Sequence, residues 1–137
     1  MKESHFVKLI KKNITIYNWM RIETTTMHGF PDMIGVAPRL DTVFIEAKVA
    51  VGNKVKLSPH QISTNIKLWK ETGGCNYIMV FKKNHAKPLS PEAINLYEGR
   101  FSLDLSRNGV SEPPTAQGWD TISSFLKRIH GSRPTKS

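Results

Sequence analysis

The stretch GFPDMIGVAPRLDTVFIEAK, residues 29–48, is the part of the sequence that decides the fold. Two apolar runs flank the break APRLD at 37–41, and this pattern predicts a β-hairpin. Side chains two residues apart share one face of a strand, so Glu46 and Lys48 point the same way. Asp32 precedes the first strand, and the hairpin brings it to the height of Glu46. We therefore expect two carboxylates and an ammonium group to converge.

The surroundings of this triad distinguish two interpretations of it. An exposed Glu-x-Lys pair on an edge strand is an ordinary surface salt bridge of little energetic worth. Residues 43–48 are, however, apolar apart from Glu46 and Lys48, as in a strand covered on both faces. Ionised groups in such a strand need a partner or a metal. A carboxylate pair holds a hard divalent cation, and a neighbouring lysine polarises a water or steadies a phosphate.

Three short motifs carry a resemblance to a known family. Asp32 after a proline, followed by Glu-x-Lys, resembles the PD-(D/E)XK nuclease superfamily. The fuller pattern is similar to its VRR-NUC (virus-type replication-repair nuclease) branch and comprises GFPD at 29–32, FIEAK at 44–48 and LSPHQ at 57–61. The similarity runs from about Glu3 to Phe81. It implies an α/β fold with a restriction-endonuclease-like αβββαβ core, whose mixed central sheet is flanked by helices.

The resemblance also implies a metal site. Asp32, Glu46 and the main-chain carbonyl of Ala47 would coordinate Mg²⁺ or Mn²⁺, and Lys48 would position the attacking water or stabilise the charged phosphate. Family members often carry a glutamate near the start of the first helix that contributes to the metal shell. Glu3 occupies that place, although an acid in a first helical turn also complements the helix dipole.

Gln61 has two interpretations that the sequence leaves open. SPHQ at 58–61 opens a helix with Ser58 as N-cap and Gln61 three residues later, which completes a capping box. The cap explains Gln61 without any chemistry. The family pattern implies instead that Gln61 reaches the active site and orients Lys48 or water.

Basic residues beside the motifs are candidate nucleic-acid ligands. Lys54 and Lys56 follow the Gly52-Asn53 turn signal, directly after the expected catalytic strand, where they would neutralise phosphates. A charged loop is also simply soluble. His28, close to Asp32 in sequence, is either a phosphate ligand or proton carrier, or a solvated turn residue.

Composition supports a nucleic-acid partner. The 137 residues include 20 Lys and Arg against 11 Asp and Glu, a formal net charge of +9. A polyanion is the natural partner of such a chain. No apolar run approaches the roughly 20 residues of a membrane span. The single cysteine, Cys75, excludes an intrachain disulfide and a cysteine-based zinc cluster, and we interpret it as a small filler residue suited to a reducing cytosol.

The remaining patterns complete one expected domain over residues 1–130. Local patterns predict a helix at Glu3–Lys12, strands from Ile14 to Thr25 and through the hairpin, a helix after Ser58 and a buried parallel strand at Asn76–Phe81. This core spans about residues 1–83. A C-terminal elaboration at 84–130 should hold a hairpin, with its second strand at 101–105 and its turn at 106–109, and then a helix. Residues 131–137 should form a flexible tail.

The principal hypothesis is a Mg²⁺-dependent DNA endonuclease. The family resemblance implies structure-selective cutting of branched DNA such as Holliday junctions, in repair or recombination, by a viral-type protein in the cytoplasm that acts as a homodimer. One alternative is a non-catalytic nucleic-acid-binding module that keeps the nuclease fold as a scaffold. Another is a sequence-specific restriction-type endonuclease.

Overall fold

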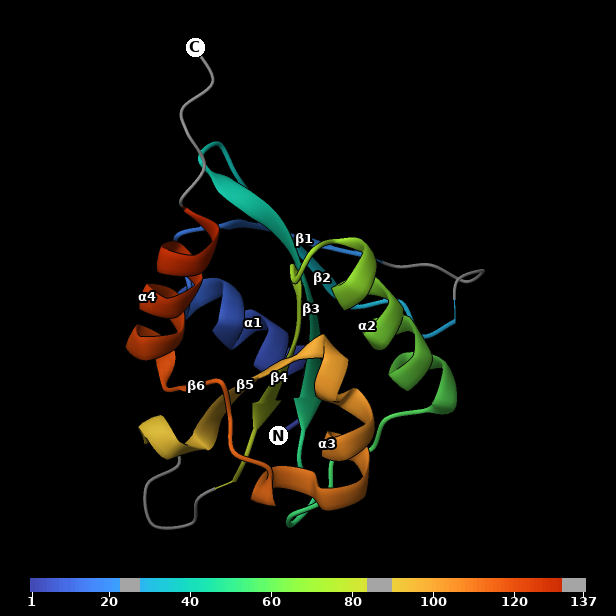
Figure 1. The fold of residues 1–137 in the computed structure, drawn as a ribbon. Coiled ribbons are helices and arrows are strands. Elements are labelled where there is room, and N and C mark those ends of the chain that lie inside the picture. The colour runs from blue at the N-terminus through green and yellow to red at the C-terminus, as the bar shows by residue number, and fades with distance from the viewer. Residues whose placement is uncertain (23–27, 84–89, 132–137) are drawn as a thin grey trace.

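The computed structural model describes residues 1–22, 28–83 and 90–131, and its centre is a six-stranded mixed sheet in the order β1-β2-β3-β4-β5-β6 (Figure 1). The strands are β1 (Asn18–Arg21), β2 (Met33–Ala37), β3 (Leu40–Val49), β4 (Asn76–Phe81), β5 (Ile94–Glu98) and β6 (Ala116–Gln117). The α-helices are α1 (Glu3–Asn13), α2 (Pro59–Glu71), α3 (Ser102–Asn108) and α4 (Trp119–His130). Within the described residues there are also three short 3₁₀ helices: η1 (Pro91–Ala93), η2 (Gly99–Phe101) and η3 (Gly109–Ser111).

The strand directions follow the predicted restriction-endonuclease-like order. β1, β2 and β3 pair antiparallel, as expected from the hairpin in residues 29–48. α2 then carries the chain back across the sheet, so that β4 pairs parallel to β3. The expected αβββαβ core is therefore confirmed. β5 and β6 extend the same sheet antiparallel beyond β4, which joins the C-terminal third to the core.

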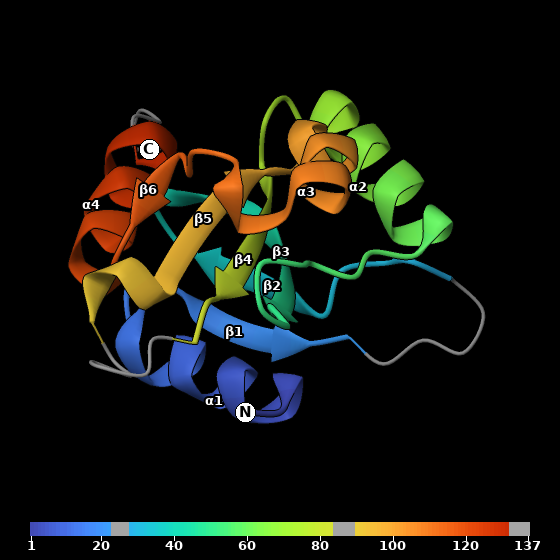
Figure 2. The same cartoon turned by 90° about the horizontal axis from the view of Figure 1, so that it is seen from below.

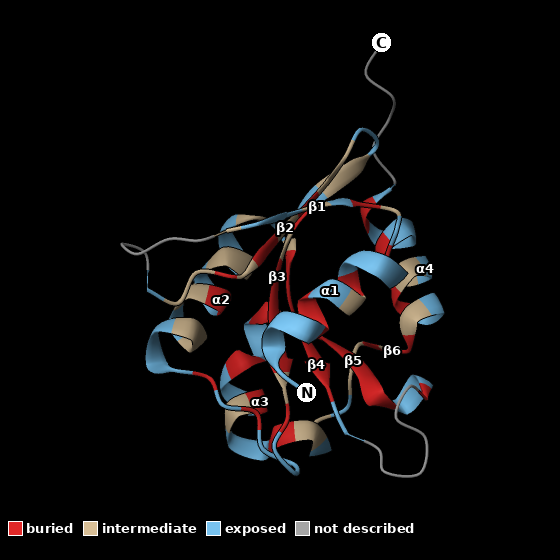
Figure 3. Cartoon of the chain, turned by 180° about the vertical axis from the view of Figure 1, so that it is seen from behind, coloured by how far each residue is buried: buried red, intermediate tan, exposed pale blue. Residues whose placement is uncertain are grey.

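The two faces of the sheet carry separate hydrophobic clusters. On one face α1 and α4 pack over the sheet, and Phe6 and Ile122 share a cluster with Ile45 and Ala47 of β3 (Figures 2 and 3). On the other face, Ile78 and Val80 of β4 pack with residues from the 50–57 segment and α3, namely Ala50, Val55, Leu57 and Leu105. Because side chains alternate along a strand, Glu46 and Lys48 lie on this second face.

Several boundaries differ from the sequence prediction. β1 covers only Asn18–Arg21, because residues 14–17 form a turn against α1; residues 23–27 lie outside the described part. The expected second strand at 101–105 is wrong, because these residues belong to η2 and α3. β5 instead pairs with the short β6, to which the chain returns only after α3. The predicted tail falls on Gly131 and on residues 132–137, which lie outside the described residues.

Candidate active site

The site forms at the fork where β2 and β3 part. The register between these strands ends with Met33 opposite Ile45, whereas β3 continues to Val49. Asp32 immediately precedes β2, and its Oδ2 accepts a hydrogen bond of 3.1 Å from the Ala47 N–H. The Asp32 side chain thus takes the place of the β2 backbone carbonyl that would otherwise pair with the Ala47 N–H. In an extended strand the N–H and C=O of one residue point to the same side, so the Ala47 carbonyl also faces the fork.

Glu46 is buried at this fork. Only 1% of the residue is exposed, and its Oε1 has no hydrogen-bond partner within the described residues. Burial raises the pKa of the Glu46 carboxyl, and a hydrogen bond to Asp32 together with the charge of Asp32 raises it further. The two carboxyl groups are therefore within hydrogen-bonding reach of each other. Two buried carboxyl groups this close together favour a positive charge between them.

Lys48 of β3 and Glu3 of α1 complete the group. Lys48, 9% exposed, lowers the pKa of Glu46 by its positive charge, against the larger effect of burial. Partial burial raises the pKa of Glu3, while Lys48 lowers it and Asp32 raises it. Because the charges of Lys48 and Asp32 act on Glu3, and the charge of Glu3 acts on Glu46, the first turn of α1 lies beside the fork. The structure thus brings together Glu3, Asp32, Glu46 and Lys48, as the hairpin pattern predicted for the last three.

The donor set at the fork fits a hard divalent cation. The available atoms are carboxylate oxygens of Asp32, Glu46 and Glu3 and the carbonyl oxygen of Ala47, and Mg²⁺ and Mn²⁺ prefer such all-oxygen sites. A buried carboxylate oxygen normally has a partner. The unpartnered Oε1 of Glu46 is therefore the specific observation that a cation would explain.

The start of α2 docks against the loop that carries Asp32. Gly29 has φ +81°, and a Cβ at this position would lie 2.4 Å from the backbone carbonyl of His60. Only glycine allows this approach. The His28 ring lies beside the His60 ring, with 5.6 Å between their centroids, and both residues are exposed. His28 therefore lies at the rim of the fork.

The Gln61 side chain completes the predicted cap, and its backbone lies beside the loop that carries Asp32. Its Oε1 accepts a hydrogen bond of 3.0 Å from the Ser58 N–H, and its own N–H donates to Ser58 Oγ at 3.1 Å, which confirms the capping box. A Cβ at Gly29 would also lie 2.7 Å from the Gln61 backbone nitrogen, so the helix start touches the Asp32 loop. The cap uses the amide oxygen of Gln61 and leaves its Nε2 for another partner.

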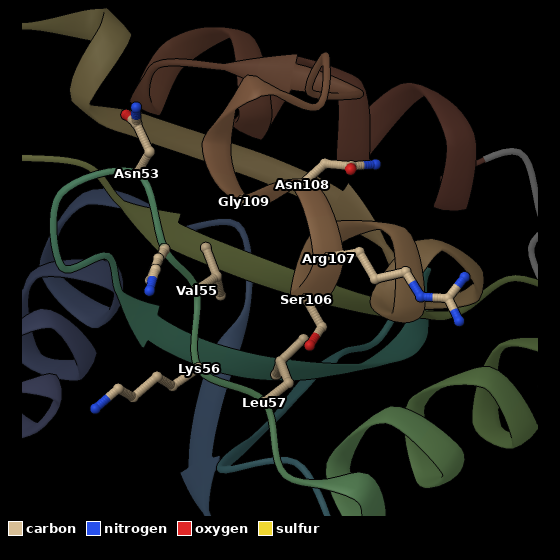
Figure 4. Close-up of a pocket in the computed structure, with 9 residues that line it drawn as sticks. Asn53, Val55, Lys56, Leu57, Ser106, Arg107, Asn108 and Gly109 are labelled. Carbon is tan, nitrogen blue, oxygen red and sulfur yellow. The ribbon is translucent and has the colours of Figure 1, made fainter.

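Lys54 and Lys56 line a separate hollow of about 430 Å³ between the 53–57 segment and residues 106–109 (Figure 4). Arg107 of α3, which no sequence pattern indicates, lines the other wall of this hollow. The two walls meet where the Val110 N–H donates to the Asn53 carbonyl at 2.9 Å. Arg107 was missed because residues 106–109 were expected to form a turn, and no local pattern links them to residues 53–57.

Comparison with known families identifies a match over most of the chain. The family model described as archaeal Holliday junction resolvase (hjc) matches residues 11–111. The matched range contains Asp32, Glu46, Lys48 and Gln61, as well as both walls of the basic hollow. No curated protein matches the chain.

Proposed function

We propose, on the premise that the chain belongs to the archaeal Holliday junction resolvase family, that it is a metal-dependent endonuclease that cuts branched DNA. This family is part of the PD-(D/E)XK superfamily of nucleases, so the predicted superfamily and the nuclease class are confirmed. The VRR-NUC branch, the viral origin and the cytoplasmic location stay predictions.

The pairing of Asp32 with Glu46 is the observation that carries the proposal. Their carboxyl groups converge at the fork, one held by the Ala47 N–H and the other with a buried oxygen left unpartnered. A scaffold that only binds DNA has no use for this arrangement, because burying two acids together is unfavourable without a cation. Retention of the pair therefore favours an enzyme over the non-catalytic module.

Each residue of the fork has a distinct part in phosphodiester hydrolysis. Asp32, Glu46 and the Ala47 carbonyl would hold Mg²⁺ or Mn²⁺, with Glu3 completing the shell from α1. When bound, the ion supplies a Lewis acid that activates water and offsets charge on the phosphate. Lys48 would stabilise the negative charge that builds on the phosphate oxygens. Gln61 would orient the attacking water through its Nε2, or Lys48 through the second lone pair of its Oε1.

The substrate side of the proposal rests on charge. The net charge of +9 favours a polyanion, and Lys54, Lys56 and Arg107 would neutralise backbone phosphates on both walls of their hollow. His28, at the rim of the fork, would contact the strand near the scissile bond. These contacts recognise the DNA backbone and carry no sequence code.

A homodimer is the assembly that fits a four-way junction, because two symmetric cuts require two copies of the fork. Ile66, Phe101 and Leu103 remain 38–41% exposed on α2, η2 and α3. Arg100 lies 4.6 Å over the Phe101 ring and 5.4 Å over the Trp69 ring, which links η2 to α2. A second copy would cover this apolar surface.

The test is cleavage of labelled four-way, flapped and linear DNA with Mg²⁺, by the wild type and by Glu46→Gln. We expect symmetric cuts in the four-way DNA by the wild type, and binding without cleavage by the variant. Binding without cleavage by the wild type would favour the non-catalytic module. Cuts at one fixed sequence in linear DNA would favour the restriction-type enzyme.

A further inference from the structure

Three residues far apart in the sequence meet at the opposite end of β3 from the fork. They are Asp41 near the start of β3, Cys75 just before β4 and His130 at the end of α4. Figure 1 shows the three elements β3, β4 and α4. One potential metal-binding atom from each lies within 4.8 Å of the other two. His130 Nδ1 lies 3.0 Å from Asp41 Oδ2 and 3.9 Å from Cys75 Sγ.

This cluster is independent of the acidic fork. Asp41 and Glu46 lie on the same strand, and at about 3.3 Å per residue their α-carbons are roughly 16 Å apart. The two groups also differ in chemistry. The fork offers only oxygen donors to a cation, whereas the cluster offers one sulfur, one imidazole nitrogen and one carboxylate oxygen.

Neighbouring tyrosines hold the potential ligands in place. The Tyr77 hydroxyl lies 2.7 Å from His130 Nε2, and the His130 side chain is only 3% exposed. Without an ion, Nδ1 carries the ring proton and donates it to Asp41 Oδ2, since a carboxylate only accepts. When an ion binds, the ring proton shifts to Nε2, which donates it to the Tyr77 hydroxyl, and Nδ1 presents its lone pair to the ion. The Tyr17 hydroxyl donates to the Asp41 backbone carbonyl at 3.1 Å. Outer partners of this kind orient the ligands of metal sites.

The spacing suits a tetrahedral ion. With ordinary zinc bond lengths, the ligand atoms of a tetrahedral centre lie about 3.4 to 3.6 Å apart. Two of the observed separations, 3.0 and 3.9 Å, lie on either side of this range, and the third, between Cys75 Sγ and the Asp41 carboxylate, is within 4.8 Å, so the side chains must adjust to reach tetrahedral spacing. A thiolate with an imidazole selects Zn²⁺ or Co²⁺ over Mg²⁺. The Asp41 side chain is 23% exposed, which leaves room for a water as fourth ligand.

We propose that Asp41, Cys75 and His130 bind a zinc-class transition-metal ion that clamps the end of α4 to the sheet. Binding deprotonates the Cys75 thiol and releases its proton to solvent. The ion has a structural role, because it joins β3, the residue before β4 and the end of α4. Strand cleavage at the fork does not depend on it.

Cobalt is the probe, because Cys75 is the only cysteine in the chain. We expect the full chain to bind one equivalent of Co²⁺ with a thiolate-to-cobalt charge-transfer band, and equimolar Zn²⁺ but not excess Mg²⁺ to abolish the band. Cys75→Ser should lack the band, and Asp41→Asn should weaken cobalt binding at least about tenfold, since loss of an outer partner alone weakens metal sites 10- to 100-fold. The exposed His60→Ala is the matched control and should behave as wild type.

Thermal melts distinguish ion binding by Asp41, Cys75 and His130 from adventitious ion binding elsewhere on the protein. Zn²⁺ should raise the melting temperature of the wild type and of His60→Ala but not of Cys75→Ser, while Cys75→Ser keeps Mg²⁺-dependent cleavage. Absence of the charge-transfer band in the folded wild type would overturn the proposal. An equal thermal shift by Zn²⁺ in the wild type and Cys75→Ser would overturn it as well.

Discussion

The Asp32 carboxylate accepts a hydrogen bond of 3.1 Å from the Ala47 backbone N–H, across the point where β2 and β3 diverge. This contact fixes the first acid of the site against the strand that carries the second. Glu46 precedes Ala47, and its side chain lies on the face that holds Ile78 and Val80. The geometry of the fork therefore depends on where the hydrogen-bonded ladder between β2 and β3 stops.

Removal of either acid should abolish cleavage while DNA binding persists. We expect Glu46→Gln and Asp32→Asn to lose at least about 100-fold in rate, the scale of losing one electrostatic contact in an active site. The basic hollow is untouched, so affinity for four-way DNA should stay within about threefold. Single-turnover cleavage and gel-shift titration measure the two quantities. The exposed Glu71→Gln on α2 serves as control and should cut normally.

Stability of the metal-free protein should fall as pH rises. Burial raises the pKa of Glu46 above its ordinary value of 4.5, so the folded chain binds this proton more tightly than the unfolded chain. The resulting stabilisation is complete below the ordinary value and is lost as pH rises toward the raised pKa. Glu46→Gln should flatten this dependence and be more stable than wild type at alkaline pH. Urea unfolding in a chelator across the pH range measures it.

Added Mg²⁺ should reverse that loss of stability at high pH, because an ion that binds only the folded state stabilises it by mass action. The effect should be absent in Glu46→Gln. An equal Mg²⁺ effect in both proteins would show that the ion binds elsewhere. Glu71→Gln should follow the wild type in this comparison too.

Two substitutions at Gln61 separate its two roles. Glutamate also completes a capping box, so Gln61→Glu keeps the cap but replaces the amide Nε2 with a charged carboxylate oxygen. Gln61→Ala loses both, and should reduce stability by about 1 kcal/mol, the usual worth of a cap interaction. We expect both variants to cleave DNA more slowly than the wild type, and only Gln61→Ala to have a lower melting temperature. Normal cleavage by Gln61→Glu at normal stability would leave Gln61 with the cap alone.

The basic hollow should be visible in the salt dependence of DNA binding. Each phosphate contact contributes about 0.9 to the slope of log affinity against log salt concentration. Lys56→Ala and Arg107→Ala should therefore each lower the slope by about 1. Lys127→Ala on α4 supplies a control of equal charge that lies outside the hollow. An unchanged slope in both hollow variants would exclude these residues from the DNA interface.

Gly29 should tolerate alanine less well than Gly52, a second glycine with positive φ. Gly52 has φ +60° and nothing within 4 Å of an added Cβ, so Gly52→Ala tests backbone strain alone, roughly 1 to 2 kcal/mol. At Gly29 the added Cβ also meets the His60 carbonyl at 2.4 Å. Gly29→Ala should therefore destabilise the protein more than Gly52→Ala in urea unfolding. It should also slow cleavage, since the Asp32 loop must move away from α2.

Much of the core could be predicted from the sequence because its signals are local. Alternation placed Glu46 and Lys48 on one face, and the spacing of SPHQ placed Ser58 as an N-cap. The C-terminal third was harder. Residues 101–105 resemble a strand in composition, yet they form η2 and the start of α3, where Ser102 Oγ donates to the Ile62 carbonyl at 3.0 Å. Tertiary contacts with α2 outweigh local preference there.

The sequence by itself determined the acid pair, the lysine beside it and the strand order, because strand periodicity and turn residues act over a few positions. Only the tertiary structure decided which distant groups meet. Glu3 reaches the fork through the packing of α1, and the packing of α3 places Arg107 on the hollow that Lys56 also lines. His130 reaches Asp41 across 89 residues. Such meetings depend on how helices dock on the sheet, and that docking is set by the whole hydrophobic core rather than by any short motif.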